Sequence, residues 1–276
     1  MSSNKARLCP NCRRLVSRDA PSCPHCGLSR PGASWKGLVG AFSQLEPERL
    51  IRLLIGINVL MYILSLILSP QGVHTGMMNP FRLLSPDNRV LLQLGASGTV
   101  PINALGHWWS LISANYLHGG LLHIIFNMMA LHQLGPLVIR EYGLARMTVI
   151  YTAGGVGGYL VSYLVGIPFT LGASAAICAL IGAILYYGKS RGGAYGGELF
   201  SQVGGWAIGI GLFGLLVPGI NNWAHGGGIL GGALLGYLLG YRERGRESFT
   251  QQVLAAGCAL LTVAILLWAV AGYLFA

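Results

Sequence analysis

Charged residues are scarce in this chain of 276 residues, where Asp, Glu, Lys and Arg together make up 9% of the sequence. Only 8 residues are acidic, while 53% are hydrophobic and 42 are glycines. Soluble domains carry about 25% charged residues. The composition therefore excludes an ordinary soluble protein and is typical of an all-α polytopic membrane protein.

Seven apolar runs are long enough to be interpreted as helices that cross about 30 Å of hydrocarbon. They are Leu50–Leu68, Leu121–Ile139, Met147–Val165, Ser174–Gly188, Val203–Val217, Ala224–Tyr241 and Val253–Phe275. The fourth and fifth runs have only 15 residues each, which as helices would reach about 22 Å. We expect helices this short to end inside protein or in a water-filled cavity.

The basic residues indicate the orientation, because Lys and Arg collect in cytoplasmic loops. Residues 1–50 hold eight of the 18 Lys and Arg, and a cytoplasmic N-terminus would put 16 of the 18 on the inner side. This predicts a multi-pass protein of a bacterial inner membrane or plasma membrane with a cytoplasmic N-terminus. The net charge of +10 then reflects topology and contact with anionic lipid, so no nucleic-acid partner is expected.

Polar side chains gather near one end of three of these runs. His118, His123 and Asn127 lie at the start of the second run, Ser174 opens the fourth, and His225 lies near the start of the sixth. All three runs cross from outside to inside in the predicted orientation, so these side chains should converge at one depth. Polar side chains in hydrocarbon are costly and usually functional. This set holds a nucleophile, a base and hydrogen-bond donors, which is the inventory of acyl-transfer chemistry.

The positions also suggest a role for each residue. Ser174 follows Gly172 at a helix start, where free N–H groups and the helix dipole favour an oxyanion. His123 and Asn127 are four residues apart on one helix face and can donate to the same oxyanion. His225 would take the serine proton. No acidic residue lies in the outer half of any run, which predicts a Ser–His dyad without a carboxylate.

Glycines recur every fourth residue after this histidine, at positions 228, 232, 236 and 240. Such a repeat lines one helix face and permits close backbone approach to a neighbour. We expect it to bring the imidazole of His225 within reach of a hydroxyl on the next helix.

Structural roles remain open for each residue taken singly. Ser174 could serve as a helix N-cap, His225 as an interfacial histidine, and Asn127 as a helix–helix contact. A transporter or metal permease could use His118, His123 and His225 as metal ligands. The five-residue spacing of His118 and His123 turns them to different helix faces, and no intramembrane carboxylate assists them, which argues against this class.

The first 35 residues hold a different motif. Cys9-Pro-Asn-Cys12 and Cys23-Pro-His-Cys26 form two C-x-x-C pairs, a spacing typical of tetrahedral zinc. Four protein ligands leave the metal no open position, so we expect structural zinc and no cofactor for catalysis. Two disulfides are the alternative, although cytosol keeps thiols reduced. The predicted domains are a zinc-ribbon-like module at 1–35, a linker at 36–49 and a transmembrane domain at 50–276.

Four segments follow one another in the order of a known family: GHWWSLISANYLHGGLLHIIFNMMALHQLG, REYGLARMTVIYTAGGVGGYLVS, LGASAAICALIGA and AHGGGILGGALLG. Through them, residues from about 91 to 240 resemble the rhomboid family of intramembrane serine proteases. The resemblance implies a six-helix catalytic bundle, here with one extra C-terminal helix. It also implies a nucleophile (Ser174), a base (His225), oxyanion donors (His123, Asn127), supporting residues (His118, Gly172) and a residue near the substrate side (Phe126).

Four positions depart from the family pattern. Ala175 replaces the glycine after the nucleophile, Cys178 an aromatic residue, Ser110 an arginine, and Ile139 a glutamate. The dyad is intact, so we expect a serine endopeptidase that cuts transmembrane protein substrates within the lipid bilayer near its outer side. A non-proteolytic rhomboid-like protein that binds membrane helices is the alternative.

Overall fold

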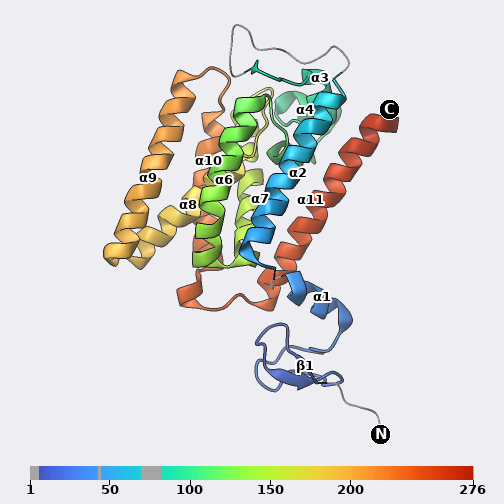
Figure 1. Cartoon of the computed structure of the whole chain (residues 1–276), viewed down its shortest axis with the longest axis vertical. Coiled ribbons are helices and arrows are strands. Elements are labelled where there is room, and N and C mark those ends of the chain that lie inside the picture. Colours follow the sequence, from blue (N-terminus) through green and yellow to red (C-terminus); the bar gives the residue numbers. More distant parts are fainter. Residues whose placement is uncertain (1–5, 43–44, 70–81, 276) are drawn as a thin grey trace.

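The computed structural model describes residues 6–42, 45–69 and 82–275, which are mainly helical. Within these ranges seven helices have 18 residues or more: α2 (Pro47–Ile67), α6 (Leu121–Tyr142), α7 (Leu144–Leu164), α8 (Ser174–Arg191), α9 (Gly193–Leu216), α10 (Asn222–Leu239) and α11 (Phe249–Phe275). They form one bundle (Figure 1), with the N-terminal module at one end and the short helices α3 (Asn88–Gln93) and α4 (Thr99–Leu105) at the other. The predicted all-α polytopic fold is confirmed.

Four of the long helices have the length and apolar composition of a membrane span: α2, α6, α9 and α11. The remaining three, α7, α8 and α10, were also interpreted as spans from the sequence. They are poorer in large apolar residues because they pack mainly against one another, through small residues such as Gly154 of α7 and Ala179 of α8. The apolar helices identify an integral membrane protein.

The predicted glycine repeat of α10 packs on alanines that recur every fourth residue of α8. The close pairs are Gly228 with Ala175, Gly232 with Ala179, and Gly236 with Ala183. A methyl group on Gly232 would lie 1.9 Å from the carbonyl oxygen of Ala179, so only glycine fits there. Gly240 behaves differently, because it follows the helix with φ 67° and ends it.

The two helices predicted to be short are longer than expected. α8 extends three residues beyond Gly188 and has 18 residues, about 27 Å. The prediction for α9 was wrong, since this helix has 24 residues and begins at Gly193 instead of Val203. The small residues that resembled a loop pack closely: a methyl group on Gly196 would lie 2.7 Å from the carbonyl oxygen of Gly188.

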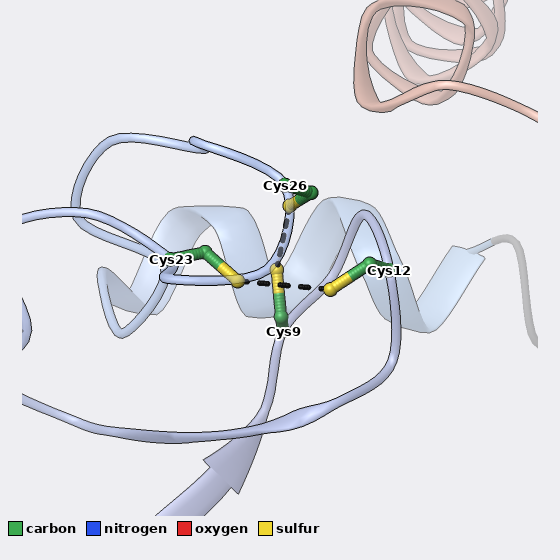
Figure 2. A group of neighbouring side chains, drawn as sticks. All are labelled: Cys9, Cys12, Cys23 and Cys26. Carbon is green, nitrogen blue, oxygen red and sulfur yellow. Dashed lines mark hydrogen bonds between the residues drawn. The ribbon is translucent and has the colours of Figure 1, made fainter.

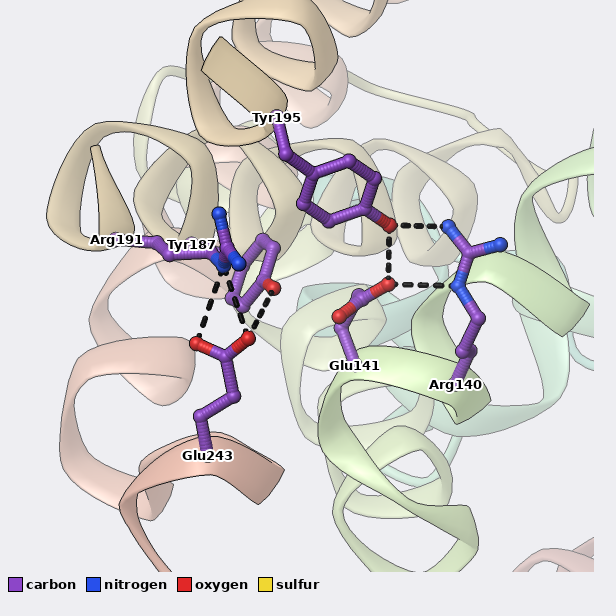
Figure 3. A network of polar contacts seen from close by, with 6 residues as sticks. All are labelled: Arg140, Glu141, Tyr187, Arg191, Tyr195 and Glu243. Atoms are coloured by element: carbon purple, nitrogen blue, oxygen red, sulfur yellow. Dashed lines mark hydrogen bonds and ion pairs between the residues drawn. The ribbon is translucent and has the colours of Figure 1, made fainter. Parts of the chain in front are cut away.

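A polar network holds the start of α9 to the ends of its neighbours (Figure 3). Tyr195 of α9 donates to Glu141 of α6 at 2.7 Å, and Arg140 of α6 pairs with both. Arg191, which ends α8, pairs with Glu243 in the turn after α10 at 2.9 Å. The network joins α6, α8 and α9 to the turn after α10, at the end of the bundle that faces the N-terminal module.

The N-terminal module begins with an antiparallel hairpin of β1 (Ala6–Leu8) and β2 (Leu15–Ser17), in which Arg7 pairs with Val16. Helix α1 (Ser34–Phe42) follows. The predicted linker at 36–49 thus contains most of α1 and the first turn of α2. Residues 1–5 and 43–44 of the predicted module and linker lie outside the described residues, and the domain boundaries remain a prediction.

Candidate active site

Ser174 and His225 lie within hydrogen-bonding distance, with 2.9 Å between the serine Oγ and the histidine Nε2. Ser174 is the first residue of α8, and His225 lies in the first turn of α10. The N-cap position of α8 is Ala173, which makes no side-chain cap, so the serine does not have the ordinary capping role. The close α8–α10 contact brings the two side chains together across 51 residues of sequence.

The second ring nitrogen of His225, Nδ1, is buried and has no hydrogen-bond partner among the described residues. A serine–histidine–carboxylate triad would place an acidic oxygen there. No described carboxylate bonds to this nitrogen, and the Ser–His dyad stays a prediction.

The segment that leads into Ser174 is held by backbone contacts. Gly172 has φ 126°, a conformation that favours glycine. Its N–H donates to the carbonyl of Ala114 at 2.8 Å, and its carbonyl accepts from the hydroxyl of Tyr159 at 2.5 Å. These bonds fix the approach of the chain to Ser174.

His123 of α6 faces the same segment. A methyl group on Gly172 would lie 2.5 Å from the His123 Nε2 and 3.7 Å from the Ser174 Oγ. The N–H of Gly119 donates to the His123 Nδ1 at 3.4 Å. This bond favours the tautomer with its proton on Nε2, so that a donor points toward the segment that leads into Ser174.

His118 packs its ring edge-on against His123, with 5.1 Å between ring centroids. The side chain is completely buried, and neither ring nitrogen has a partner among the described residues. This contact suits a supporting position behind His123.

Asn127 lies one turn after His123 and is buried. Its amide donates to the carbonyl of His123 at 2.9 Å, and no hydrogen bond among the described residues joins it to Ser174. One amide proton remains for an incoming acceptor, so its predicted role stays a prediction.

Two residues of this region were missed in the sequence analysis. Tyr159 lies in an apolar run and offers no local signal. Asn221 directly precedes α10 and accepts from the N–H of Ala224 at 3.1 Å, so it is the N-cap of the helix that carries His225. Asparagine before a helical run is a recognised start signal, which could have identified it.

The four departures from the family pattern all occupy buried positions. Ser110 donates to Ser97 at 3.2 Å, and Ile139 belongs to the hydrophobic core. The Cβ of Ala175 points toward Gly158 and the Cβ of Cys178 toward Gly228, with 3.1 Å to where a methyl group on each glycine would lie. Ala175 thus adds a methyl group to the family pattern, whereas Cys178, Ser110 and Ile139 are smaller or less polar than the residues they replace.

The four N-terminal cysteines form a separate candidate metal site (Figure 2). Their sulfur atoms all lie within 4.8 Å of one another, with Cys9 3.7 Å from Cys26 and Cys12 3.6 Å from Cys23. Four thiolates at about 2.3 Å from a tetrahedral metal would be about 3.8 Å apart. All six cysteines are free, and these separations are far beyond a disulfide bond of about 2.05 Å. The group can hold a metal ion.

Comparison with known proteins identifies the family. Residues 105–242, half of the chain, match the Rhomboid domain family. The chain belongs to the rhomboid family.

The relatives include bacterial and plant rhomboids. The chain is 32% identical over 196 residues to Rhomboid protease GluP of Bacillus subtilis (strain 168), covering 69% of this chain and 36% of that protein. It is 33% identical over 161 residues to RHOMBOID-like protein 4 of Arabidopsis thaliana, covering 57% and 40%. RHOMBOID-like protein 6, mitochondrial, of Arabidopsis thaliana is 31% identical over 205 residues, covering 67% and 66%. The matched region thus spans less than half of the first two relatives.

Proposed function

We propose that this rhomboid is an intramembrane serine endopeptidase in which Ser174 is the nucleophile and His225 the general base. The observation that carries the proposal is the 2.9 Å separation of the Ser174 Oγ and the His225 Nε2. Both side chains lie in the membrane bundle, where a polar pair is retained mainly for function. The protease names of relatives such as GluP support the same reaction class.

In this reaction the Ser174 hydroxyl attacks the scissile carbonyl carbon while its proton passes to the His225 Nε2. The C–O bond forms and the carbonyl oxygen becomes an oxyanion. When the C–N bond breaks, His225 returns the proton to the leaving amine. Water then attacks the acyl-enzyme with His225 again as base, releasing the acid and restoring the serine.

The oxyanion would be stabilised by the free N–H of Ser174 at the start of α8 and by the Nε2–H of His123. Asn127 is the proposed third donor. The position of the His123 Nε2 beside Gly172 supports the second of these roles. Such donors act mainly on charge that develops in the transition state.

The proposed substrates are transmembrane helices cut near the outer side of the membrane. This side follows from the proposed cytoplasmic N-terminus, which rests on the 16 basic residues of 18 that would lie inside. Helical peptide bonds are shielded, so small or helix-breaking residues near the scissile bond would favour unwinding. Zinc held by the four cysteines would be structural.

The experiment measures cleavage of a transmembrane substrate by purified protein, together with labelling by a fluorophosphonate probe. Ser174→Ala and His225→Ala should each abolish cleavage, and the double variant should be no worse, because residues that act as a unit are non-additive. Asp87→Asn, which keeps the cap of α3, is the matched control and should retain activity.

Labelling of the wild type at Ser174 should fall sharply in His225→Ala. Substantial proteolysis by folded Ser174→Ala would refute the mechanism. A folded wild type that neither cleaves nor reacts with the probe would favour a non-proteolytic helix-binding protein.

A further inference from the structure

One side chain, that of Asn221, connects three segments around the candidate active site. Its Oδ1 accepts from the N–H of Ala224 in α10. Its Nδ2 donates to the Oγ of Ser162 near the end of α7 at 2.6 Å and to the Oγ1 of Thr170 at 3.0 Å. Both amide protons are therefore used, and neither bond is needed to cap α10.

The two ends of this connection lie close to the proposed catalytic pair. The N–H of His225 donates to the carbonyl of Asn221 at 3.2 Å, so the base is one turn away from it. Thr170 lies four residues before Ser174, and its backbone pairs with that of Ser97 at 2.8 and 2.9 Å. The side chain thus joins the helix of the base to the segment that leads to the nucleophile.

We propose that Asn221 is a positioning residue, which keeps the base helix in register with the nucleophile segment. In triads a carboxylate bonded to Nδ1 orients the imidazole, whereas the Nδ1 of His225 has no partner among the described residues. The orientation of this ring then depends on where the backbone of α10 is held. The catalytic part of this inference rests on the proposed function.

Three variants separate positioning from capping. Asn221→Ser keeps a good N-cap but is too short for the two additional bonds. Asn221→Asp keeps the cap, and its carboxylate can accept from the hydroxyls of Ser162 and Thr170. Combining Ser162→Ala with Thr170→Val removes both acceptors and leaves Asn221 itself unchanged.

We expect Asn221→Ser to lower kcat about tenfold or more with little change in KM, since displacements of about 1 Å reduce rates by up to 10²-fold. Asn221→Asp should restore most of the rate. The kcat of the Ser162→Ala/Thr170→Val variant should match that of Asn221→Ser. Combining all three substitutions should cause no further loss of kcat. Thermal denaturation should show Asn221→Ser folded, with a midpoint close to that of the wild type.

Hydrogen exchange gives a readout that does not need activity. In Asn221→Ser, exchange should rise over residues 170–175 as well as at the start of α10. Unchanged exchange over residues 170–175 would overturn the inference, as would a wild-type kcat in folded Asn221→Ser. An inactive, unlabelled wild type would instead refute the proposed function, and exchange would still decide the role of Asn221.

A second, independent observation concerns the N-terminal module. Asn11 lies between two candidate metal ligands, Cys9 and Cys12, and its Oδ1 accepts from the N–H of Phe249 at 2.9 Å. Phe249 is the first residue of α11, so a residue 238 positions away satisfies a free N–H of this helix. Pro10 accepts from Gln252 in the first turn of the same helix at 3.4 Å.

The same asparagine belongs to the tight loop that carries the first two cysteines. The N–H of Arg13 donates to the carbonyl of Cys9 at 2.8 Å, and the N–H of Cys9 donates to the carbonyl of Arg14 at 2.9 Å. A metal bound by Cys9 and Cys12 would hold this loop on both sides of Asn11. Asn11 thus links the candidate metal site to the start of α11.

We infer that metal bound to the four cysteines fixes Asn11 as the cap of α11, so that metal occupancy sets the order of the inner end of the last membrane helix. The test compares full-length protein loaded with zinc and treated with chelator. Zinc should slow hydrogen exchange over residues 249–253. Asn11→Ala should still bind one zinc but lose this protection, whereas Asn11→Asp, which keeps an acceptor, should retain it. Equal protection of Asn11→Ala and the wild type, or no effect of zinc on α11, would overturn the inference.

Discussion

Replacing Gly232 with alanine tests whether the separation of α8 and α10 sets the geometry of the proposed dyad. The added methyl group would lie 1.9 Å from the carbonyl oxygen of Ala179 and 2.5 Å from its Cα. Carbon atoms in ordinary contact are about 3.5–4.0 Å apart. Both clashing groups belong to the backbone of α8, so the side chains cannot relieve the overlap and the helices must separate by about 1 Å.

Two effects follow from this separation. Overpacking of this kind typically destabilises a protein by about 1–3 kcal/mol. The shift would also lengthen the 2.9 Å contact of the Ser174 Oγ and the His225 Nε2 beyond hydrogen-bonding range, where a displacement of about 1 Å lowers the rate by about 10²-fold. We expect cleavage and fluorophosphonate labelling to fall together in protein that remains folded.

Gly231→Ala is the matched control on the neighbouring residue. Its methyl group would meet nothing closer than 3.8 Å, the carbonyl oxygen of Gly154, and alanine favours the helix by up to about 1 kcal/mol. The control should keep both activity and stability. Wild-type cleavage by Gly232→Ala, or an equal loss in Gly231→Ala, would refute the argument that close helix approach sets the dyad.

Four further predictions concern single contacts and the metal. Gly172→Ala should reduce cleavage by about 10²-fold, because its methyl group would lie 2.5 Å from the His123 Nε2; normal kinetics would show that the segment can adapt. Tyr159→Phe should lower kcat by a smaller factor and reduce the melting temperature, because it removes the bond to the Gly172 carbonyl. Ala175→Gly should change cleavage little, because its methyl group packs on Gly158 and away from the nucleophile. Chelation should remove one equivalent of metal and leave cleavage measurable, whereas an immediate loss restored by zinc would assign the metal to the chemistry.

The sequence was most informative where a periodic pattern of residues had a steric cause. Glycines at every fourth position predicted a face of close approach, and the helices do approach at Gly228 and Gly232. Polar side chains in apolar runs identified residues that converge in space, since Ser174 contacts His225 and His123 lies beside Gly172. Polar side chains are costly in hydrocarbon and are usually functional there. Such residues are therefore easier to recognise than the polar residues of a soluble protein.

Other features could not be predicted because they depend on partners distant in sequence. The first turns of α9 are held by Glu141, which lies 54 residues from Tyr195. Helix α1, most of which was predicted as linker, packs on α11 through Trp35, whose ring centroid is 5.7 Å from that of Phe249. Local composition describes such segments as loops, and only the tertiary contacts make them helical.

The packing of α8 against α7 and α10 explains why the family's glycine can be replaced by Ala175. Alanine at this position belongs to the row of small residues on which α10 lies, together with Ala179 and Ala183. Its methyl group fills the space left by Gly158 of α7. A glycine is therefore not required after Ser174, because Gly158 of α7 leaves room for the methyl group of Ala175. Helices α7, α8 and α10 carry side chains of complementary size where they meet. A substitution at Gly158, Ala175 or Gly228 should therefore be interpreted together with the residues that face it.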